Sequence, residues 1–279
     1  MSQLVIGSRG SKLALWQAEH IQSLMAARGL DARVEIIHTT GDKITDVPLA
    51  QLGAQTSTKG LFTKELEEAL LDGRIDLAVH SMKDMPTELP AGLEITAIPE
   101  REDARDALIG GTLADLPQGA RVGTSALRRH AQLKAARPDL IIESIRGNVD
   151  TRLRKLDEGQ FDVILLAVAG LKRLGWAHRI TDYVPVELMC PAVGQGALAV
   201  ETRSGDTRFT FLDHPPTRAS VEMERDFLRA MGGGCQVPMG CHVSEGLLRC
   251  AVAEPDGTRL RKFLGEGPDV VARALEAVR

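Results

Sequence analysis

The feature that most constrains the fold is a repeated alternation of short apolar strands and amphipathic helices. Strands are predicted at residues 4–7, 34–38 and 77–80, and helices lie between them at 11–28 and 60–71. Such a strand–helix–strand order joins parallel strands through crossover helices. It therefore predicts a mostly parallel sheet with helices on both faces.

The same alternation restarts near Arg101 and predicts a second α/β domain. The second set comprises strands at 121–123, 140–143 and 163–167 and helices at 126–136 and 149–158. A further strand, at 198–201, is expected to return to the first domain.

The last part of the chain predicts a small α+β domain. A linker at 214–216 leads to a helix at 218–231, weak strands at 247–252 and 261–263, and a closing helix from Asp269. The fold class is therefore α/β, with two lobes of mostly parallel sheet and a small α+β C-terminal domain. The predicted boundaries are 1–99 with 190–213 for the first lobe, 100–189 for the second lobe and 214–279 for the C-terminal domain.

Composition excludes several classes of protein. No apolar run in the 279 residues approaches the ~20 that a membrane-spanning helix needs, and the N-terminus does not read as a signal peptide. A net charge of −4 and 3% aromatic residues disfavour a nucleic-acid-binding protein. We therefore expect a cytoplasmic protein with reduced cysteines and with no membrane or nucleic-acid partner.

Basic and hydroxyl residues follow nearly every predicted strand. Arginines make up 25 of the 34 basic residues, and a coding bias alone would scatter them. Parallel strands end at one edge of a sheet, where ligands bind next to helix N-termini. The residues gathered there are Arg9, Ser11, Ser81, Lys83, Thr124, Ser125, Arg128, Arg129, Arg146, Arg152 and Arg173. Their positions favour an anion-binding cleft that holds several carboxylates or phosphates.

Each of these residues also has a plain structural interpretation. Arg128 and Arg129 lie in the first turn of a helix, where the helix dipole disfavours cations. A ligand anion would explain them, and so would an ion pair with a helix carboxylate. Ser81, Thr124 and Ser125 are equally suited to capping helices, and His80 to a hydrogen bond at a strand end.

Asp84 is the one carboxylate in the stretch from His80 to Pro86. It is either an ion-pair partner of Lys83 or of an arginine, or a negative charge directed at a cation that develops during a reaction. Pro86 restricts Met85 to extended backbone and so helps to fix the turn.

Cys235 follows three glycines, which remove side-chain cover from the thiol. That setting favours an accessible nucleophile, whereas Cys190 and Cys250 have core-like surroundings. A zinc site at Cys235, Cys241 and His242 is a weaker interpretation, because the usual closely spaced cysteine pair is missing.

Together these residues resemble the porphobilinogen deaminase family over nearly the whole chain. The most specific stretch is residues 224–240, Glu-Arg-Asp-Phe-Leu-Arg-Ala-Met-Gly-Gly-Gly-Cys-Gln-Val-Pro-Met-Gly, which is similar to the family's cofactor-attachment signature. Four more motifs agree in order, at 79–84, 123–129, 146–148 and 191–196.

The resemblance implies periplasmic-binding-protein-like lobes and a dipyrromethane cofactor held by a thioether to Cys235. On this primer, four porphobilinogen units are added head to tail with loss of ammonia, and water then releases hydroxymethylbilane. The implied enzyme is a monomeric transferase of porphyrin, heme and other tetrapyrrole biosynthesis, with porphobilinogen and its oligomers as its partners. The alternative from the residues alone is a non-catalytic receptor for carboxylates or other anions with the same two lobes.

The resemblance also assigns roles to residues, with Asp84 as the catalytic group. The implied cofactor-binding residues are Ser81, Lys83, Asp84, Thr124, Ser125, Arg128, Arg129 and Arg146, and the implied substrate-binding residues are Arg9, Ser11, Gln17, Arg146, Arg152, Arg173 and Gln195. The chain departs from the family pattern at Ala126 (usually serine), at Gln51 (commonly lysine) and at 54–57, an apparent insertion in a lid over 43–59. The C-terminal domain also ends early.

Overall fold

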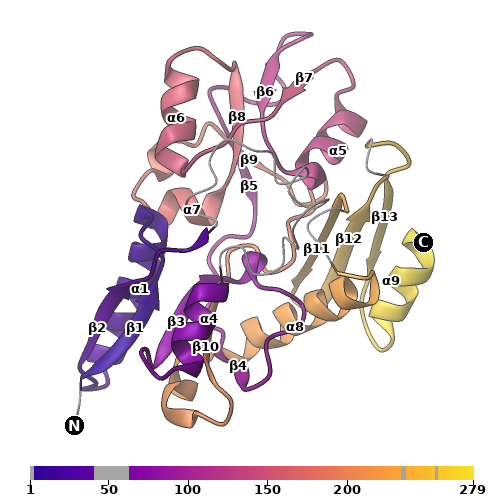
Figure 1. Cartoon of the computed structure of the whole chain (residues 1–279). Helices are drawn as coiled ribbons and strands as arrows, with labels where there is room; N and C mark the ends of the chain where they lie inside the picture. The colour runs from indigo at the N-terminus through magenta and orange to yellow at the C-terminus, as the bar shows by residue number, and fades with distance from the viewer. Residues whose placement is uncertain (1–2, 41–62, 234–236, 255–256) are drawn as a thin grey trace. The chain divides into compact units, whose positions relative to one another are not determined.

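The computed structural model describes residues 3–40, 63–233, 237–254 and 257–279 (Figure 1). The chain divides into two units, Met1–Arg101 with Ala197–Arg218 and Glu102–Gly196 with Ala219–Arg279. The three-part division made from the sequence is finer than this and stays a prediction. Within the described ranges, no helix has both the length and the apolar character needed to cross a membrane.

The first unit is built on a five-stranded sheet in the order β2-β1-β3-β10-β4. The strands are β1 (Leu4–Ser8), β2 (Ala32–Ile36), β3 (Leu77–Ser81), β4 (Leu93–Ala97) and β10 (Leu198–Arg203). β1 pairs in parallel with β2 and β3, whereas β10 runs antiparallel to both β3 and β4. Four of the five strands therefore point the same way, and the strand predicted at 198–201 does return to this sheet.

Helices cover both faces of the first sheet. α1 (Lys12–Ala26) packs Ile21 and Met25 on the face that carries Leu77. α4 (Lys64–Leu71) packs on the opposite face, together with Ala78. The two 3-10 helices of this unit are η1 (Met82–Asp84) and η3 (Thr207–Leu212). Burial on both faces explains why β3 opens with three apolar residues in a row, Leu77–Val79.

The second unit contains a sheet of the same design, in the order β7-β6-β8-β5-β9. Its strands are β5 (Asp106–Ile109), β6 (Arg121–Gly123), β7 (Ile141–Glu143), β8 (Val163–Ala167) and β9 (Asp182–Val184), and here β5 is the antiparallel member. α5 (Leu127–Ala136) packs on one face, and α6 (Val149–Asp157) and α7 (Val168–Arg173) pack on the other.

A three-stranded antiparallel sheet completes the second unit, with α8 and α9 packed against it (Figure 1). Its strands are β11 (Met239–Ser244), β12 (Leu247–Val252) and β13 (Arg261–Gly265), and the helices are α8 (Pro215–Ala230) and α9 (Val270–Val278); η2 (Ala177–Arg179) lies earlier in the unit. The chain passes close to itself at Gly240, where an added Cβ would meet the carbonyl oxygens of Cys190 and Pro191. The predicted fold class is confirmed.

Candidate functional site

In the first unit, the ends of β1 and β3 bring two of the predicted segments to one edge of the sheet. The strands are parallel neighbours, so the chain leaves both at the same edge. Arg9 follows β1 and is half-buried, and the Ser11 hydroxyl caps α1 by accepting a 3.3 Å bond from the Ala14 amide. Gln17, buried on α1, donates through Nε2 to Ser81 Oγ at 2.8 Å. This bond ties the helix to the end of β3.

Asp84 lies in η1, directly after β3, where buried neighbouring side chains and a backbone hydrogen bond fix the turn. Met82 and Met85 are buried, while the side chains of Lys83 and Asp84 between them are exposed. The Met82 amide donates to the Ala197 carbonyl at 3.0 Å. The turn therefore presents a carboxylate and an ammonium at the sheet edge on an anchored backbone.

His80, one residue before the end of β3, faces a buried carboxylate. Its Nε2 lies 3.0 Å from Oε2 of Glu201 on β10, and both side chains are almost completely buried. The prediction of a hydrogen-bonded strand-end histidine is confirmed. Glu67 on α4 is also buried, and burial together with the charge of Glu201 raises its pKa, against the opposing effects of Thr63 and His80.

Glu67→Gln is expected to stabilise the protein at neutral pH. The folded chain raises the pKa of Glu67 and so favours its protonated carboxyl. The contribution of this carboxyl to folding stability is therefore fully present below its pKa in the unfolded chain, and it is lost as pH rises through its pKa in the folded chain. The neutral amide avoids that loss, and we expect a Tm about 2–4 °C higher near neutral pH, or about 1 kcal/mol. Thermal unfolding followed by circular dichroism measures it.

Two comparisons test that result. The gain should vanish below about pH 4, where Glu67 is protonated in the folded and the unfolded chain. Glu68→Gln, at the exposed neighbouring position, should give no such gain. An equal Tm increase in both variants would contradict the explanation.

In the second unit, the ends of β6 and β7 bring hydroxyl groups together. Ser125, after β6, donates through Oγ to the Ile145 carbonyl at 2.6 Å and lies 2.8 Å from Ser144 Oγ. The Thr124 hydroxyl accepts a 3.3 Å bond from the Ala126 amide, and Thr124 is buried. Thr124 therefore supports the turn into α5 but does not cap the helix, whose N-cap residue is Ala126 and has no side-chain cap bond. Ser81 lies at the N-cap of η1, but its side chain makes no cap bond, so the prediction that these residues cap helices is wrong. Ser125 is exposed at the edge.

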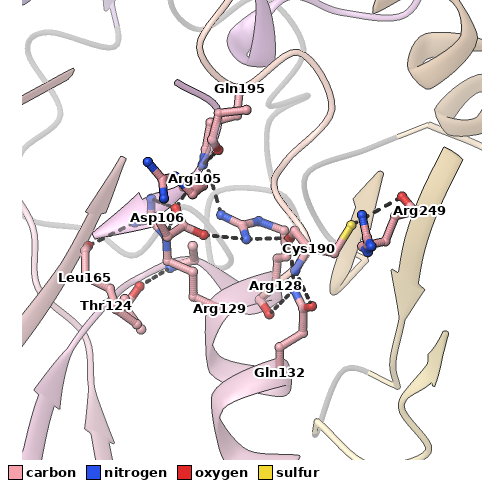
Figure 2. A network of polar contacts seen from close by, with 12 residues as sticks. Arg105, Asp106, Thr124, Arg128, Arg129, Gln132, Leu165, Cys190, Gln195 and Arg249 are labelled. Atoms are coloured by element: carbon pink, nitrogen blue, oxygen red, sulfur yellow. Dashed lines mark hydrogen bonds and ion pairs between the residues drawn. The ribbon is translucent and has the colours of Figure 1, made fainter. Parts of the chain in front are cut away.

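Arg128 and Arg129, in the first turn of α5, are buried and share one carboxylate (Figure 2). Asp106 Oδ2 accepts a 2.7 Å bond from Arg128 Nη1, and Oδ1 accepts from Nε and Nη2 of Arg129 at 3.0 and 2.7 Å. Burial opposes ionisation of Asp106, but the two guanidiniums outweigh it and hold its pKa well below the usual range. The predicted ion pair exists, and its carboxylate comes from β5, not from the helix.

Arg146 and Arg152 extend this cationic group. Arg152, on α6, donates through Nε to the Gly147 carbonyl at 2.8 Å. Its pKa is lowered to about 10, first by burial and then by the charges of Arg129 and Arg146. Arg128, Arg129, Arg146 and Arg152, with Asp106, form what we call the arginine cluster, whose formal charge is +3. A depressed arginine pKa marks a place where an added anion would be favourable.

Two family models match the chain. Residues 4–210 match "Porphobilinogen deaminase, dipyromethane cofactor binding domain", and residues 219–277 match "Porphobilinogen deaminase, C-terminal domain". Curated porphobilinogen deaminases are about half identical to it. The one from Nitratidesulfovibrio vulgaris Hildenborough is 54% identical and covers 99% of this chain and 92% of its own length. The one from Geobacter sulfurreducens is 52% identical, with 96% and 87% covered.

The chain belongs to the porphobilinogen deaminase family. Members of this family are transferases of tetrapyrrole biosynthesis that carry a dipyrromethane cofactor. Solved structures with a similar fold include a periplasmic substrate-binding protein of an ABC transporter from Coxiella burnetii (TM-score 0.44, 15% identity, 75% of this chain and 90% of that one). The methionine-binding protein MetQ is a second (TM-score 0.44, 14% identity, 83% and 96%).

Two further residues that the porphobilinogen deaminase resemblance assigns to the substrate lie in the second unit and are buried. Arg173, at the end of α7, donates through Nη2 to the Gly196 carbonyl at 2.6 Å, and burial, which outweighs Glu102, lowers its pKa to about 10. Gln195 Nε2 donates to Asp106 Oδ1 at 2.9 Å and to the Ala104 carbonyl at 2.6 Å. Gln195 is therefore linked to the arginine cluster through Asp106.

Cys235, which the resemblance implies as the cofactor-attachment residue, lies outside the described residues. So do Gln51, the 54–57 insertion and the whole lid at 43–59. Cys190, Cys241 and Cys250 are buried thiols, as predicted for Cys190 and Cys250. Burial raises the pKa of Cys190 well above its usual range and that of Cys250 to about 12, which suppresses the reactive thiolate. The described part of the chain contains no cluster of residues suited to a metal ion.

Proposed function

We propose that this chain deaminates four porphobilinogen molecules, joins them head to tail on a dipyrromethane primer and releases hydroxymethylbilane by hydrolysis. The observation that supports this reaction most directly is the arginine cluster, which occurs here in a chain of the porphobilinogen deaminase family. Arg128 and Arg129 share the carboxylate of Asp106, and the charges of Arg129 and Arg146 act on the nearby Arg152. Each pyrrole of the substrate carries two carboxylates, so primer and product bring many negative charges to one site.

The residues present fit a dipyrromethane group. In the second unit, Arg129 is almost completely buried, and its pKa is lowered by burial and by Arg128 despite Asp106. Arg152 has a lowered pKa as well. Carboxylates placed beside these two side chains would receive charge-assisted hydrogen bonds and would relieve the repulsion between the cations. With Arg129, the residues of this unit proposed to hold the cofactor are Thr124, Ser125, Arg128 and Arg146, while Arg152 is proposed to bind the substrate.

The first unit supplies a second set of polar groups. Arg9 and Ser11 at the end of β1, with Ser81 and Lys83 at the end of β3, are proposed to bind carboxylates of cofactor and substrate. Gln17 holds Ser81 by their 2.8 Å bond, so it acts here by orienting that hydroxyl. Arg173 and Gln195 are proposed as substrate-binding residues of the second unit.

Asp84 is proposed as the catalytic residue. Loss of ammonia from porphobilinogen leaves positive charge on the pyrrole ring of the substrate. A carboxylate that accepts the pyrrole N–H stabilises that charge, and it can also deliver a proton to the departing amine. Asp84 suits both roles because it is exposed on a turn that buried Met82 and Met85 anchor.

Cys235 is proposed as the attachment point of the primer. When bound, the dipyrromethane supplies the terminal pyrrole carbon to which the first substrate is joined. The three described cysteines are buried, so they are poor nucleophiles. That leaves the thiol that follows the three glycines.

Release of ammonia from porphobilinogen tests the proposed function. The purified chain should release one ammonia for each porphobilinogen consumed and should form hydroxymethylbilane. A receptor for anions with the same lobes would bind porphobilinogen and leave it intact. Binding without ammonia release would therefore reject the transferase in favour of the receptor. A monomeric state, a cytoplasmic location and the lack of nucleic-acid and membrane partners are part of the same proposal.

A further inference from the structure

Asp106 uses both carboxylate oxygens to hold side chains of the second unit. It accepts from Arg128, Arg129 and Gln195, and its own side chain is completely buried (Figure 2). Four donor atoms lie within 2.7–3.0 Å of its two oxygens. Such a carboxylate determines where each of these donors can point.

The same donors reach backbone carbonyls on separate segments. Arg128 Nη1 also donates to the Cys190 carbonyl at 2.7 Å, and Arg129 Nη1 donates to the Leu165 carbonyl at 3.0 Å. Gln195 Nε2 reaches the Ala104 carbonyl at 2.6 Å. Asp106 is thus the common acceptor for donors that link α5, the central strand β8 and the segment around Cys190 and Gln195.

Charge distinguishes Asp106 from a simple space-filling residue. It is the one carboxylate in the arginine cluster, and it offsets part of the repulsion between Arg128 and Arg129. Among described residues, the hydrogen bonds of Arg129 use three of its five N–H groups. The remaining two belong to a buried guanidinium of fixed orientation.

We propose that Asp106 is a positioning residue for the anionic cofactor and substrate, acting through Arg128, Arg129 and Gln195 without touching either ligand. By fixing the two guanidiniums, it directs their remaining N–H groups to the carboxylates of the ligand. This inference rests on the proposed function, and it deepens that function by adding a residue that the motifs at the strand ends did not include.

Asp106→Asn separates positioning from simple charge attraction. The variant has nearly the same shape, makes the arginine cluster more positive by one charge and replaces an acceptor with an amide N–H donor. If attraction alone mattered, the variant would bind the anionic cofactor better. Positioning predicts the opposite: the fraction of chains that carry the cofactor mass should fall about 10-fold or more, as when a buried charge pair is broken.

The measurements are intact mass for cofactor loading, circular dichroism for folding, and KM and kcat of the loaded fraction. Asp139→Asn is the matched control, since Asp139 also receives two bonds from one arginine, Arg137, at 2.9 and 2.8 Å. The control should load as the unmodified chain does. A folded Asp106→Asn chain that loads normally and has an unchanged KM overturns the proposal.

If the Asp106→Asn variant does not fold, Asp106→Glu tests the positioning role of Asp106 instead. It keeps the negative charge but displaces it by one methylene, so we expect loading above that of Asp106→Asn, with KM for porphobilinogen raised about 5-fold or more. A glutamate variant with normal loading and an unchanged KM also overturns the proposal. If the unmodified active chain carried no added mass, the covalent primer of the proposed function would be wrong. A failure of the Asp106 proposal differs, because there the unmodified chain carries the added mass and the Asp106 variants load normally.

Discussion

Asp84→Asn is expected to lower kcat by about 10²–10³-fold while leaving the fold and the cofactor mass in place. The asparagine keeps the shape of the side chain but removes the negative charge that stabilises the cation formed as ammonia leaves. Loss of one preorganised group of this kind costs about 3–4 kcal/mol in the barrier. Because the Asp84 side chain is exposed and does not pack in the core, the variant should fold normally. Initial rates of ammonia release measure the effect.

The control for Asp84 is Glu88→Gln, which removes a carboxylate four positions further along the same segment. Its kcat should stay within about threefold of that of the unmodified chain. The two variants should carry the same cofactor mass, so that a loss of rate is not a loss of primer. A near-normal kcat for Asp84→Asn would remove Asp84 from the mechanism.

Periodicity in the sequence predicted most of the helices well. The Ser11 cap and the apolar stripe after it placed α1 correctly, and the prediction for α6 differs from the structure by one residue at its end. α1 carries its own start signal and a clear apolar face, so local information was sufficient to place it. The closing helix, α9, is also present.

Four of the described strands were not predicted from the sequence: β4, β5, β9 and β11. β9 has only three residues, and β5 has four, of which the first is charged. Short strands of this kind are defined by their neighbours in the sheet and not by their own pattern. Their places became clear only from pairings with distant segments, such as β5 with β8.

Asp106 was missed for the same reason. The predicted site residues follow the ends of strands, where parallel strands gather their side chains, whereas Asp106 lies at the beginning of β5. β5 runs antiparallel to β8, with Asp106 opposite Ala167, so the beginning of β5 lies where β8 ends. The one signal in the sequence was a charged residue that opens the apolar run Ala107–Ile109. The arginines were predicted from local motifs, whereas their partner depended on sheet topology.

Cys235→Ser is expected to abolish the covalent cofactor and, with it, turnover. A serine hydroxyl is a far weaker nucleophile than a thiol at neutral pH, so it should not form the corresponding ether bond to the cofactor. The unmodified chain should weigh more than its sequence by one constant increment, and the serine variant should match its sequence mass. Ehrlich's reagent, which colours pyrroles, should stain the first protein and leave the second colourless. We expect ammonia release to fall below about 1% of that of the unmodified chain, since the three described cysteines are buried and cannot replace Cys235 as the nucleophile.

Cys250→Ala provides the matched control, because it removes a buried thiol whose pKa burial raises to about 12. That variant should keep the added mass and the colour, with at most a modest fall in Tm from the lost side-chain volume. An added mass that persists in Cys235→Ser, or that disappears in Cys250→Ala while the protein stays folded, would place the attachment elsewhere. Because burial suppresses the thiolate at the core cysteines, the pattern expected across the two variants is loss at position 235 and retention at position 250.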